Sequence, residues 1–428
     1  MSISSAPPQT EHRVGVLDRA VLTLYLTSLA LLPWAWFPPF PWLHEHAQWS
    51  DPVFAATTAC WAVARWRAGR WPHFGATNLA IAGYLAAASL SLLFSSPHEP
   101  ASAWKLLGIA ELCCLAIVTA DLASDPRVLR GIGRVMMVTA LLVAAAAVSG
   151  LILFYLGKET RLIGIYGELT PSPFYARVQA GLYNPNLLAS FCIFAGASIG
   201  HRDAELPVWL RRIGLAALWV TVGLTFSRGI IGFAVAALIR QAHTRGRRTL
   251  AGLGAFAGVA LMIILTFCKF SLDPTRPFEA HISRSTSTSR YQSLITSLQS
   301  VVTYPLFGTG PGTHPARYLG IPFDSHMTYI GIAATLGLPA LAFFSWLVCK
   351  AWLGRRRPTE LSLWGVMAGL ALDGLGQDIE SFRHVWVLIG LVLADAARSQ
   401  NPRSGSTRSA RTIKAGSSET AISPPDRL

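Results

Sequence analysis

Four basic residues have the chemistry of an anion-binding and proton-accepting site: Arg228, Arg284, Arg290 and His326. Arginine suits a phosphate or diphosphate because its planar guanidinium forms paired hydrogen bonds and keeps its charge. A histidine beside such a group can accept a proton from an attacking hydroxyl. Three of these residues also have a simpler interpretation: His326 can cap a helix, Arg290 can be solvated on a surface helix, and Arg228 can reach lipid headgroups.

An apolar composition sets the environment of these residues. Hydrophobic residues make up 52% of the 428 residues, charged residues only 14%, and mean hydropathy is +0.42. These values exclude an ordinary soluble domain and predict an all-α polytopic membrane protein. No A-x-A-like site follows the first apolar run, so no cleavable signal peptide is expected. About twelve runs approach the roughly 20 apolar residues that a crossing needs. They are residues 20–37, 53–64, 76–94, 104–120, 135–156, 187–200, 206–226, 229–239, 250–267, 327–348, 361–375 and 385–396.

The basic residues predict the orientation of these spans. About 25 of the 36 Lys and Arg residues fall in the two termini and in one alternating set of loops, which the positive-inside rule makes cytoplasmic. The net charge of +14 is therefore a topology signal before it is a sign of nucleic acid. Both termini are then cytoplasmic, and two loops, residues 157–183 and 269–325, lie outside.

The short run Ser227-Arg228-Gly229 interrupts an apolar stretch whose two flanks are both basic. Because both flanks should be cytoplasmic, the chain must fold back, and these residues become the outer tip of a hairpin. The second arm has about 11 to 14 apolar residues, or roughly 20 Å of helix against a bilayer core of about 30 Å. We expect Arg228 to lie below the outer surface, where an arginine marks a functional site by default.

The long outer loop of residues 269–325 is the main polar interruption of the chain. Apolar residues recur from Leu294 to Val301 with a spacing near 3.6, which predicts a helix along the outer membrane surface with Arg290 at its polar start. A glycine cluster follows and either lets the backbone approach a ligand or only shapes a turn. It comprises Gly308, Gly310 and Gly312.

Polar residues of the other outer segments are weaker candidates. Arg177 could bind the same anion, and Asn186 is interpreted as the cap of the span that begins there. Four charged or titratable residues near the last outer turn are interpreted as a local ion-pair group. They are Asp378, Glu380, Arg383 and His384.

Neither a metal nor another cofactor is expected. The six cysteines lie in or beside apolar runs without metal-ligand spacing and are interpreted as packing residues. No Asp-x-Asp pair stands in an outer loop, so arginines rather than Mg²⁺ would neutralise a bound diphosphate. Residues 398–428 are rich in Ser, Arg and Pro and predict a disordered basic cytoplasmic tail after a transmembrane domain of residues 1–397.

Short motifs in a fixed order resemble the O-antigen ligase family, which includes O-antigen ligases, O-antigen polymerases and bacterial protein O-oligosaccharyltransferases. They lie within residues 160–395. The motifs are Asn184-Pro185-Asn186-Leu187-Leu188-Ala189, Ser227-Arg228-Gly229, Arg290, Pro305-Leu306-Phe307-Gly308-Thr309-Gly310-Pro311-Gly312, and His326 with Tyr329 and Leu336-Gly337-Leu338. Many relatives have Asn directly after the histidine. This chain has Met327, which leaves the hydrogen bonding around His326 open.

The resemblance implies a metal-independent glycosyltransferase on the periplasmic face of the bacterial inner membrane. It would move a glycan from a polyprenyl-diphosphate carrier to an acceptor hydroxyl, with membrane lipids but no nucleic acid as further partners. Arg228 and Arg290 would hold the donor diphosphate, and preorganised arginines would stabilise the charge of this leaving group. His326 would act as base. Further candidates for substrate binding are Arg177, Arg284, Asn186 and Tyr329.

The acceptor stays open at this point. Length and the absence of a large C-terminal soluble domain favour a ligase that joins O-antigen to lipid A-core. The alternatives are a polymerase that extends lipid-linked repeats and a protein-glycosylating enzyme. From a different class, a secondary transporter or lipid flippase would need charged residues near mid-span and often two related halves. Asp373 and Arg228 are the few such charges, and no internal repeat is visible.

Overall fold

The computed structural model describes most of the chain. The described residues are 16–35, 48–69, 71–72, 76–95, 100–158, 160–166, 175–201, 204–227, 229–244, 254, 257–258, 269–273, 276–318, 321–323, 325–353 and 361–400.

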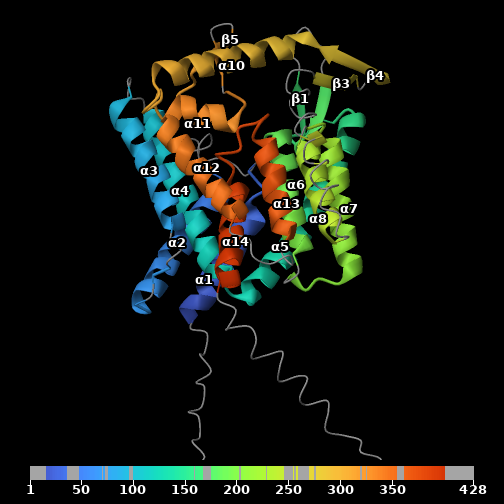
Figure 1. The fold of residues 1–428 in the computed structure, drawn as a ribbon. Coiled ribbons are helices and arrows are strands. Elements are labelled where there is room, and N and C mark those ends of the chain that lie inside the picture. The colour runs from blue at the N-terminus through green and yellow to red at the C-terminus, as the bar shows by residue number, and fades with distance from the viewer. Residues whose placement is uncertain are drawn as a thin grey trace, which may run out of the picture.

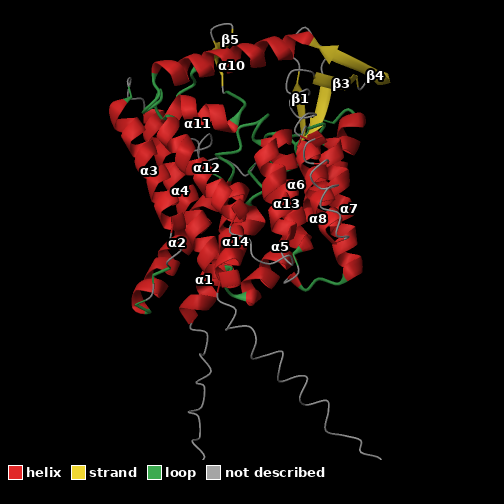
Figure 2. Ribbon diagram, in the orientation of Figure 1, coloured by secondary structure: helices red, strands yellow, loops and turns green. Residues whose placement is uncertain are grey.

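Helices make up most of the described chain, which confirms the expected helical class (Figure 2). They are α1 (Val16–Leu31), α2 (Ser50–Arg67), α3 (Ala76–Phe94), α4 (Pro100–Leu122), α5 (Pro126–Tyr155), α6 (Pro185–Gly200), α7 (Val208–Leu224), α8 (Gly229–Thr244), α10 (Arg284–Thr303), α11 (Thr328–Leu336), α12 (Leu338–Leu353), α13 (Leu361–Asp373) and α14 (Arg383–Gln400). Three antiparallel two-stranded sheets accompany them. These pair β1 (Ile163–Tyr166) with β2 (Tyr175–Val178), β3 (Lys269–Asp273) with β4 (Arg276–Ser283), and β5 (Ala316–Tyr318) with β6 (Ile321–Phe323).

Several described helices have the composition of membrane spans. Thr77–Phe94, Ser102–Leu122 and Pro126–Tyr155 are long and apolar enough to cross a membrane, and three shorter apolar helices are Pro185–Gly200, Gly229–Ile239 and Leu338–Cys349. The count of about twelve spans stays a prediction. Most of the expected span 250–267 lies outside the described residues.

Some predicted boundaries were wrong for identifiable reasons. The run 327–348 is two helices, because Gly337 has a φ of 89° between α11 and α12. Helix α5 begins at Pro126 rather than at residue 135, since the carboxylate of Asp125 accepts a hydrogen bond from the Arg127 N–H at 2.8 Å. Helix α14 continues to Gln400, past the expected start of the tail, and residues 401–428 lie outside the described residues.

Helix α10 and the strand pairs lie together at one end of the molecule, whereas α1 begins and α14 ends at the opposite end (Figure 1). The helix predicted in the long loop is therefore present, and it begins at Arg284. Its place on the outer membrane surface stays a prediction. Its buried positions include Ser293 and Ser297. Its large exposed side chains are Tyr291, Ile295, Leu298 and Val302. An apolar face turned away from the protein is typical of a helix that lies on a lipid surface.

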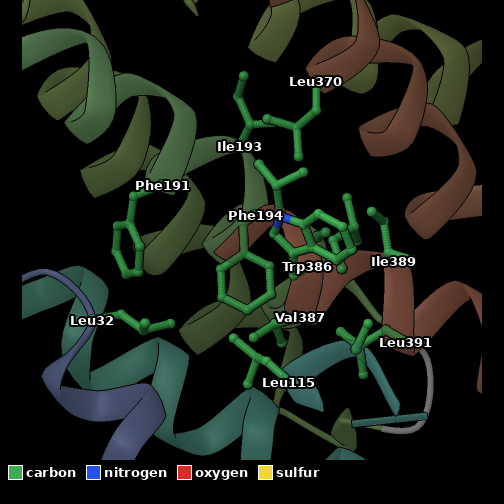
Figure 3. Close-up of a cluster of buried hydrophobic side chains, with 14 of the residues drawn as sticks. Leu32, Leu115, Phe191, Ile193, Phe194, Leu370, Trp386, Val387, Ile389 and Leu391 are labelled. Atoms are coloured by element: carbon green, nitrogen blue, oxygen red, sulfur yellow. The ribbon is translucent and has the colours of Figure 1, made fainter. Parts of the chain in front are cut away.

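The hydrophobic core lies where α4, α6, α13 and α14 meet (Figure 3). Phe191 and Phe194 of α6 are fully buried there, with their ring centroids 6.2 Å apart, and Trp386 of α14 is fully buried in the same cluster. The indole N–H of Trp386 donates a hydrogen bond to the carbonyl oxygen of Glu380 at 2.7 Å, which satisfies its one polar group. The core therefore fixes the beginning of α14 and the turn that leads into it.

Glycines bring α8 and α13 into close contact. A Cβ atom at Gly369 would lie 2.4 Å from the carbonyl oxygen of Gly232, and one at Gly365 would lie 2.9 Å from that of Ala236. Small residues four apart let two helices approach closely in a membrane. Because the helices run antiparallel, this contact sets the end of α13 beside the start of α8.

A larger side chain at this contact should separate the two helices. We expect Gly369→Leu to lower the free energy of unfolding by about 1 to 3 kcal/mol, since overpacking of a close contact costs this much. The measurement is the thermal unfolding midpoint of purified protein in detergent. Gly223→Ala in α7 is the control: no atom lies within 4 Å of its added Cβ, so its midpoint should stay or rise. Equal midpoints for both variants would contradict the prediction.

Candidate functional site

The turn between α7 and α8 is the predicted hairpin tip. Its described hydroxyl side chains are buried, whereas the Phe226 side chain is 52% exposed. Thr225 and Ser227 are 0% and 4% exposed. The Ser227 N–H donates to Thr225 Oγ1 at 3.1 Å, and the Gly229 N–H donates to Ser227 Oγ at 3.2 Å. Arg228, which stands between Ser227 and Gly229 in the chain, lies outside the described residues. The hydroxyls thus replace helical hydrogen bonds that the break between the helices removes.

Arg177 of β2 holds this tip in place. Its Nε donates to the carbonyl oxygen of Thr225 at 2.8 Å, and one terminal nitrogen donates to Asn186 Oδ1 at 2.7 Å. The same oxygen accepts the hydroxyl of Ser227 at 2.9 Å. Arg177 itself is only 8% exposed. Arg177 and Asn186 therefore join β2, α6 and the tip, and a direct contact of either with a bound anion stays a prediction.

The cap of α6 is Asn184, so the interpretation of Asn186 as the cap was wrong. The side-chain oxygen of Asn184 accepts the Asn186 N–H at 2.8 Å, and Pro185 occupies the first helical position, where no N–H is needed. The side-chain oxygen of Asn186 is therefore free of a capping role and accepts the hydrogen bonds from Arg177 and Ser227 instead.

His326 stands in an unusual backbone conformation just before α11. Its φ is 50°, in the left-handed region that few residues with a side chain adopt. Ala180 after β2 and Phe226 at the hairpin tip share this conformation, with φ values of 47° and 46°. Such backbone persists where the surrounding structure enforces it, and it clusters at functional sites. Three separate segments of the candidate site thus carry the same kind of strain.

Thr328 ties the His326 segment to the turn between α13 and α14. Its N–H points at the carbonyl oxygens of Gly374 and Gln377, at 2.9 and 3.0 Å. Its hydroxyl donates to the carbonyl oxygen of Gln377 at 2.7 Å and accepts the N–H of Ile379 at 2.9 Å. The first residue of α11 is therefore fixed to this turn through both its backbone and its side chain.

The same turn lies beside the hairpin tip. The side-chain amide of Gln377 donates to Asp373 Oδ1 at 2.6 Å, and both residues are buried. That carboxylate oxygen is 3.6 Å from the place of a Cβ on Gly229. The structure thus brings together the segments of His326 and of Ser227 to Gly229, which are about 100 residues apart in sequence.

Sequence reasoning missed most of this connection. In the sequence, Asp373 stands out only as a mid-span charge of the kind that a transporter needs, and no motif marks Thr328 or Gln377. The sequence does contain one signal, the carboxylate of Asp373 at the end of an otherwise apolar run. A carboxylate inside a membrane costs free energy and therefore marks a functional site by default.

The remaining candidates are placed less completely. The Tyr329 hydroxyl donates to the carbonyl oxygen of Ala371 at 3.0 Å, so it anchors α11 to α13. Arg284 begins α10 and Arg290 follows on the same helix, which packs against α11; the side chains of both arginines lie outside the described residues. Their contact with a substrate stays a prediction.

The glycine cluster approaches protein backbone. A Cβ on Gly308 would lie 2.4 Å from the carbonyl oxygen of Thr335. The N–H groups of Thr309 and Gly310 donate to the carbonyl oxygens of Ala334 and Thr335, each at 2.9 Å. These are terminal carbonyls of α11, which have no partner within the helix. The glycines therefore let the long loop cap α11.

Three residues of the last outer turn, Glu380, Arg383 and His384, bond to distant helices, whereas the prediction was a local ion-pair group. Arg383 pairs with Asp51 at the start of α2. Glu380 accepts the hydroxyl of Tyr84 at 2.6 Å and lies 3.5 Å from the Lys105 ammonium, while His384 hydrogen-bonds the Ser190 hydroxyl at 2.8 Å. The partners come from α2, α3, α4 and α6, because buried polar groups must find partners wherever packing places them.

Residues 213–345 match the family model described as O-Antigen ligase. This region contains the hairpin tip, α10 and His326, and the match confirms the resemblance seen in the sequence. Arg177, Asn186 and the α13–α14 turn lie outside it. No curated protein matches the chain significantly.

Removing the Arg177 side-chain charge should loosen the hairpin tip. We expect Arg177→Met to lower the free energy of unfolding by about 1 to 3 kcal/mol, because the oxygens of Thr225 and Asn186 lose a buried charged donor. The control is Arg130→Met, which removes an ion pair with Glu205 on the surface and should cost at most about 1 kcal/mol. Thermal unfolding in detergent compares the two, and an equal loss would contradict the tip-holding role.

Proposed function

We propose that this chain, whose residues 213–345 match the family model described as O-Antigen ligase, is an O-antigen ligase, which transfers a glycan from a polyprenyl-diphosphate carrier to a sugar hydroxyl of lipid A-core. The family and the apolar helices make it a membrane glycosyltransferase of the O-antigen ligase or polymerase type. The ligase role, the acceptor and the residue roles are our proposal.

One observation carries the proposal. The family match contains both Ser227-Arg228-Gly229 and His326, and the segments on which they lie contact one turn, that between Asp373 and Ile379. A diphosphate ligand and a proton acceptor must be near each other for a transfer reaction. The shared contact supports such a site.

The proposed reaction is a substitution at the anomeric carbon of the glycan. The acceptor hydroxyl oxygen attacks this carbon and gives its proton to His326. The bond from the carbon to the diphosphate oxygen breaks, and its electron pair leaves with the diphosphate. Arg228 and Arg290 hold the diphosphate and stabilise its growing charge without a metal. The carrier then departs as polyprenyl diphosphate.

The buried surroundings of the tip favour this role for arginine. Ser227 and Gly229 on either side of Arg228 are both buried, and charge interactions are stronger where water is partly excluded. Arginine also keeps its proton in such a place, whereas lysine loses its charge more readily. The distances from arginine to diphosphate are part of the proposal.

The proposed location is the bacterial inner membrane, with the site facing the periplasm and both termini in the cytoplasm. Two observations support this orientation. The basic loops predict it through the positive-inside rule. In addition, α10 lies at the end of the molecule opposite to the start of α1 and the end of α14 (Figure 1).

His326 should be essential for transfer. Purified protein is reconstituted with polyprenyl-diphosphate-linked O-antigen and lipid A-core in the presence of a chelator, and glycan transfer is followed on a gel. We expect transfer by the wild type and a loss of roughly 100-fold or more for His326→Ala, since general base catalysis contributes about 10²- to 10⁴-fold. His314→Ala, in the same loop, should keep its activity.

Other outcomes of this assay have clear meanings. If lipid-linked glycan chains grow longer and none is transferred to lipid A-core, the enzyme is a polymerase and not a ligase. Full activity of His326→Ala would exclude histidine as the base and leave the arginines. A requirement for a divalent cation would contradict the metal-independent mechanism.

The two arginines should act on the donor. We expect Arg228→Lys and Arg290→Lys to lower kcat/KM for the polyprenyl-diphosphate donor by roughly 10- to 100-fold, because a lysine cannot form the paired hydrogen bonds of a guanidinium. Arg317→Lys, in β5 of the same loop, is the control and should change kcat/KM less than threefold. The kinetics are measured by varying donor at saturating acceptor. An unchanged kcat/KM for both variants would remove the diphosphate contact from the mechanism.

A further inference from the structure

Four hydrogen bonds join Thr328, the first residue of α11, to the α13–α14 turn, and the first N–H groups of a helix have no partner within the helix. The four bonds use the N–H of Thr328 with the carbonyl oxygens of Gly374 and Gln377, and its hydroxyl with the carbonyl oxygen of Gln377 and the N–H of Ile379. Thr328 is 1% exposed, so water does not compete for these groups. The position of α11, and of His326 two residues earlier, depends on this contact.

Gln377 extends the contact toward the hairpin tip. Its backbone carbonyl accepts from Thr328, and its side-chain amide donates to Asp373 Oδ1 at 2.6 Å. Asp373 Oδ1 lies close to Gly229, at 3.6 Å from the place of its Cβ. One residue therefore connects the segment of His326 with the helix end that borders the tip.

The turn itself is held firmly from other directions. Its Glu380 carboxylate accepts the hydroxyl of Tyr84 at 2.6 Å, and the Lys105 ammonium donates to the hydroxyl of Ser381 at 2.5 Å. The Trp386 indole binds the carbonyl oxygen of Glu380 in the core. A turn fixed to α3, α4 and α14 can transmit a defined position to both segments that touch it.

We propose that Thr328 and Gln377 are positioning residues, which set the His326 segment at a fixed distance from the hairpin tip. This inference rests on the proposed function, in which a base at His326 and a diphosphate at the tip act on one substrate. Without the link, donor binding survives but the base is displaced from the acceptor hydroxyl. A displacement of about 1 Å costs roughly 100-fold in rate.

The test compares two isosteric substitutions on the same helix. Thr328→Val removes the hydroxyl that contacts the turn. Thr335→Val removes a hydroxyl that, among the described residues, bonds to the carbonyl oxygen of Gly331 within α11. For Thr328→Val we expect kcat to fall roughly 10- to 100-fold while KM for the donor changes less than about threefold. Thr328→Ser, which restores the hydroxyl, should recover most of kcat, and Thr335→Val should keep it.

Gln377→Met gives a second route if Thr328→Val folds poorly. It removes the amide that contacts Asp373 and leaves the backbone carbonyl for Thr328. We expect kcat to fall here too, and the double variant to lose less than the product of the single losses, because both act on one link.

A structural readout separates this inference from the proposed function. Hydrogen exchange of the amides from Thr225 to Ile231 should be at least about tenfold faster in Thr328→Val than in Thr335→Val, whatever the acceptor. If the wild type shows no transfer but the two valine variants differ in hydrogen exchange as expected, the ligase proposal is overturned and the positioning role is not. Equal exchange and equal kcat for the two valine variants, or no rescue by serine, would overturn the positioning role.

Discussion

The geometry of the candidate site depends on the close contact of α8 with α13. Gly232 faces Gly369 across this contact, and a Cβ on either residue would meet the backbone of the other helix within 3 Å. Two helices packed so closely cannot slide along each other without a clash. The contact therefore determines which residue of α13 stands beside the first residue of α8, and this residue is Asp373.

Buried polar groups then complete the arrangement. An apolar environment offers no water, so each donor and acceptor must be satisfied by another part of the chain. Arg177 meets this need at the hairpin tip, and Thr328 meets it at the start of α11. In both cases a side chain bonds to backbone of a different element. The same bonds that remove a cost of burial also fix the segments on which Arg228 and His326 lie.

The segments that position the site extend beyond the family match. Residues 213–345 contain the tip and His326, but Arg177, Asn186 and the turn after α13 come from before and after this region. The long loop within the match has a second task, because its glycines allow N–H groups to cap the end of α11. The helix that follows His326 is thus held at its start by the turn after α13 and at its end by the loop.

The sequence by itself determined the helical class, the break at Ser227-Arg228-Gly229, the helix in the long loop and the resemblance to the O-antigen ligase family, because these depend on local composition and on short motifs. It also indicated the turn at residues 308–312 but not what the glycines approach. Only the tertiary structure decided the partners of the buried polar residues. Glu380 and Arg383 looked like local ion pairs, yet they bond to Tyr84 and Asp51 from distant helices. A hydrogen bond depends on distance in space, and no pattern along the chain records that Thr328 and Gln377 meet.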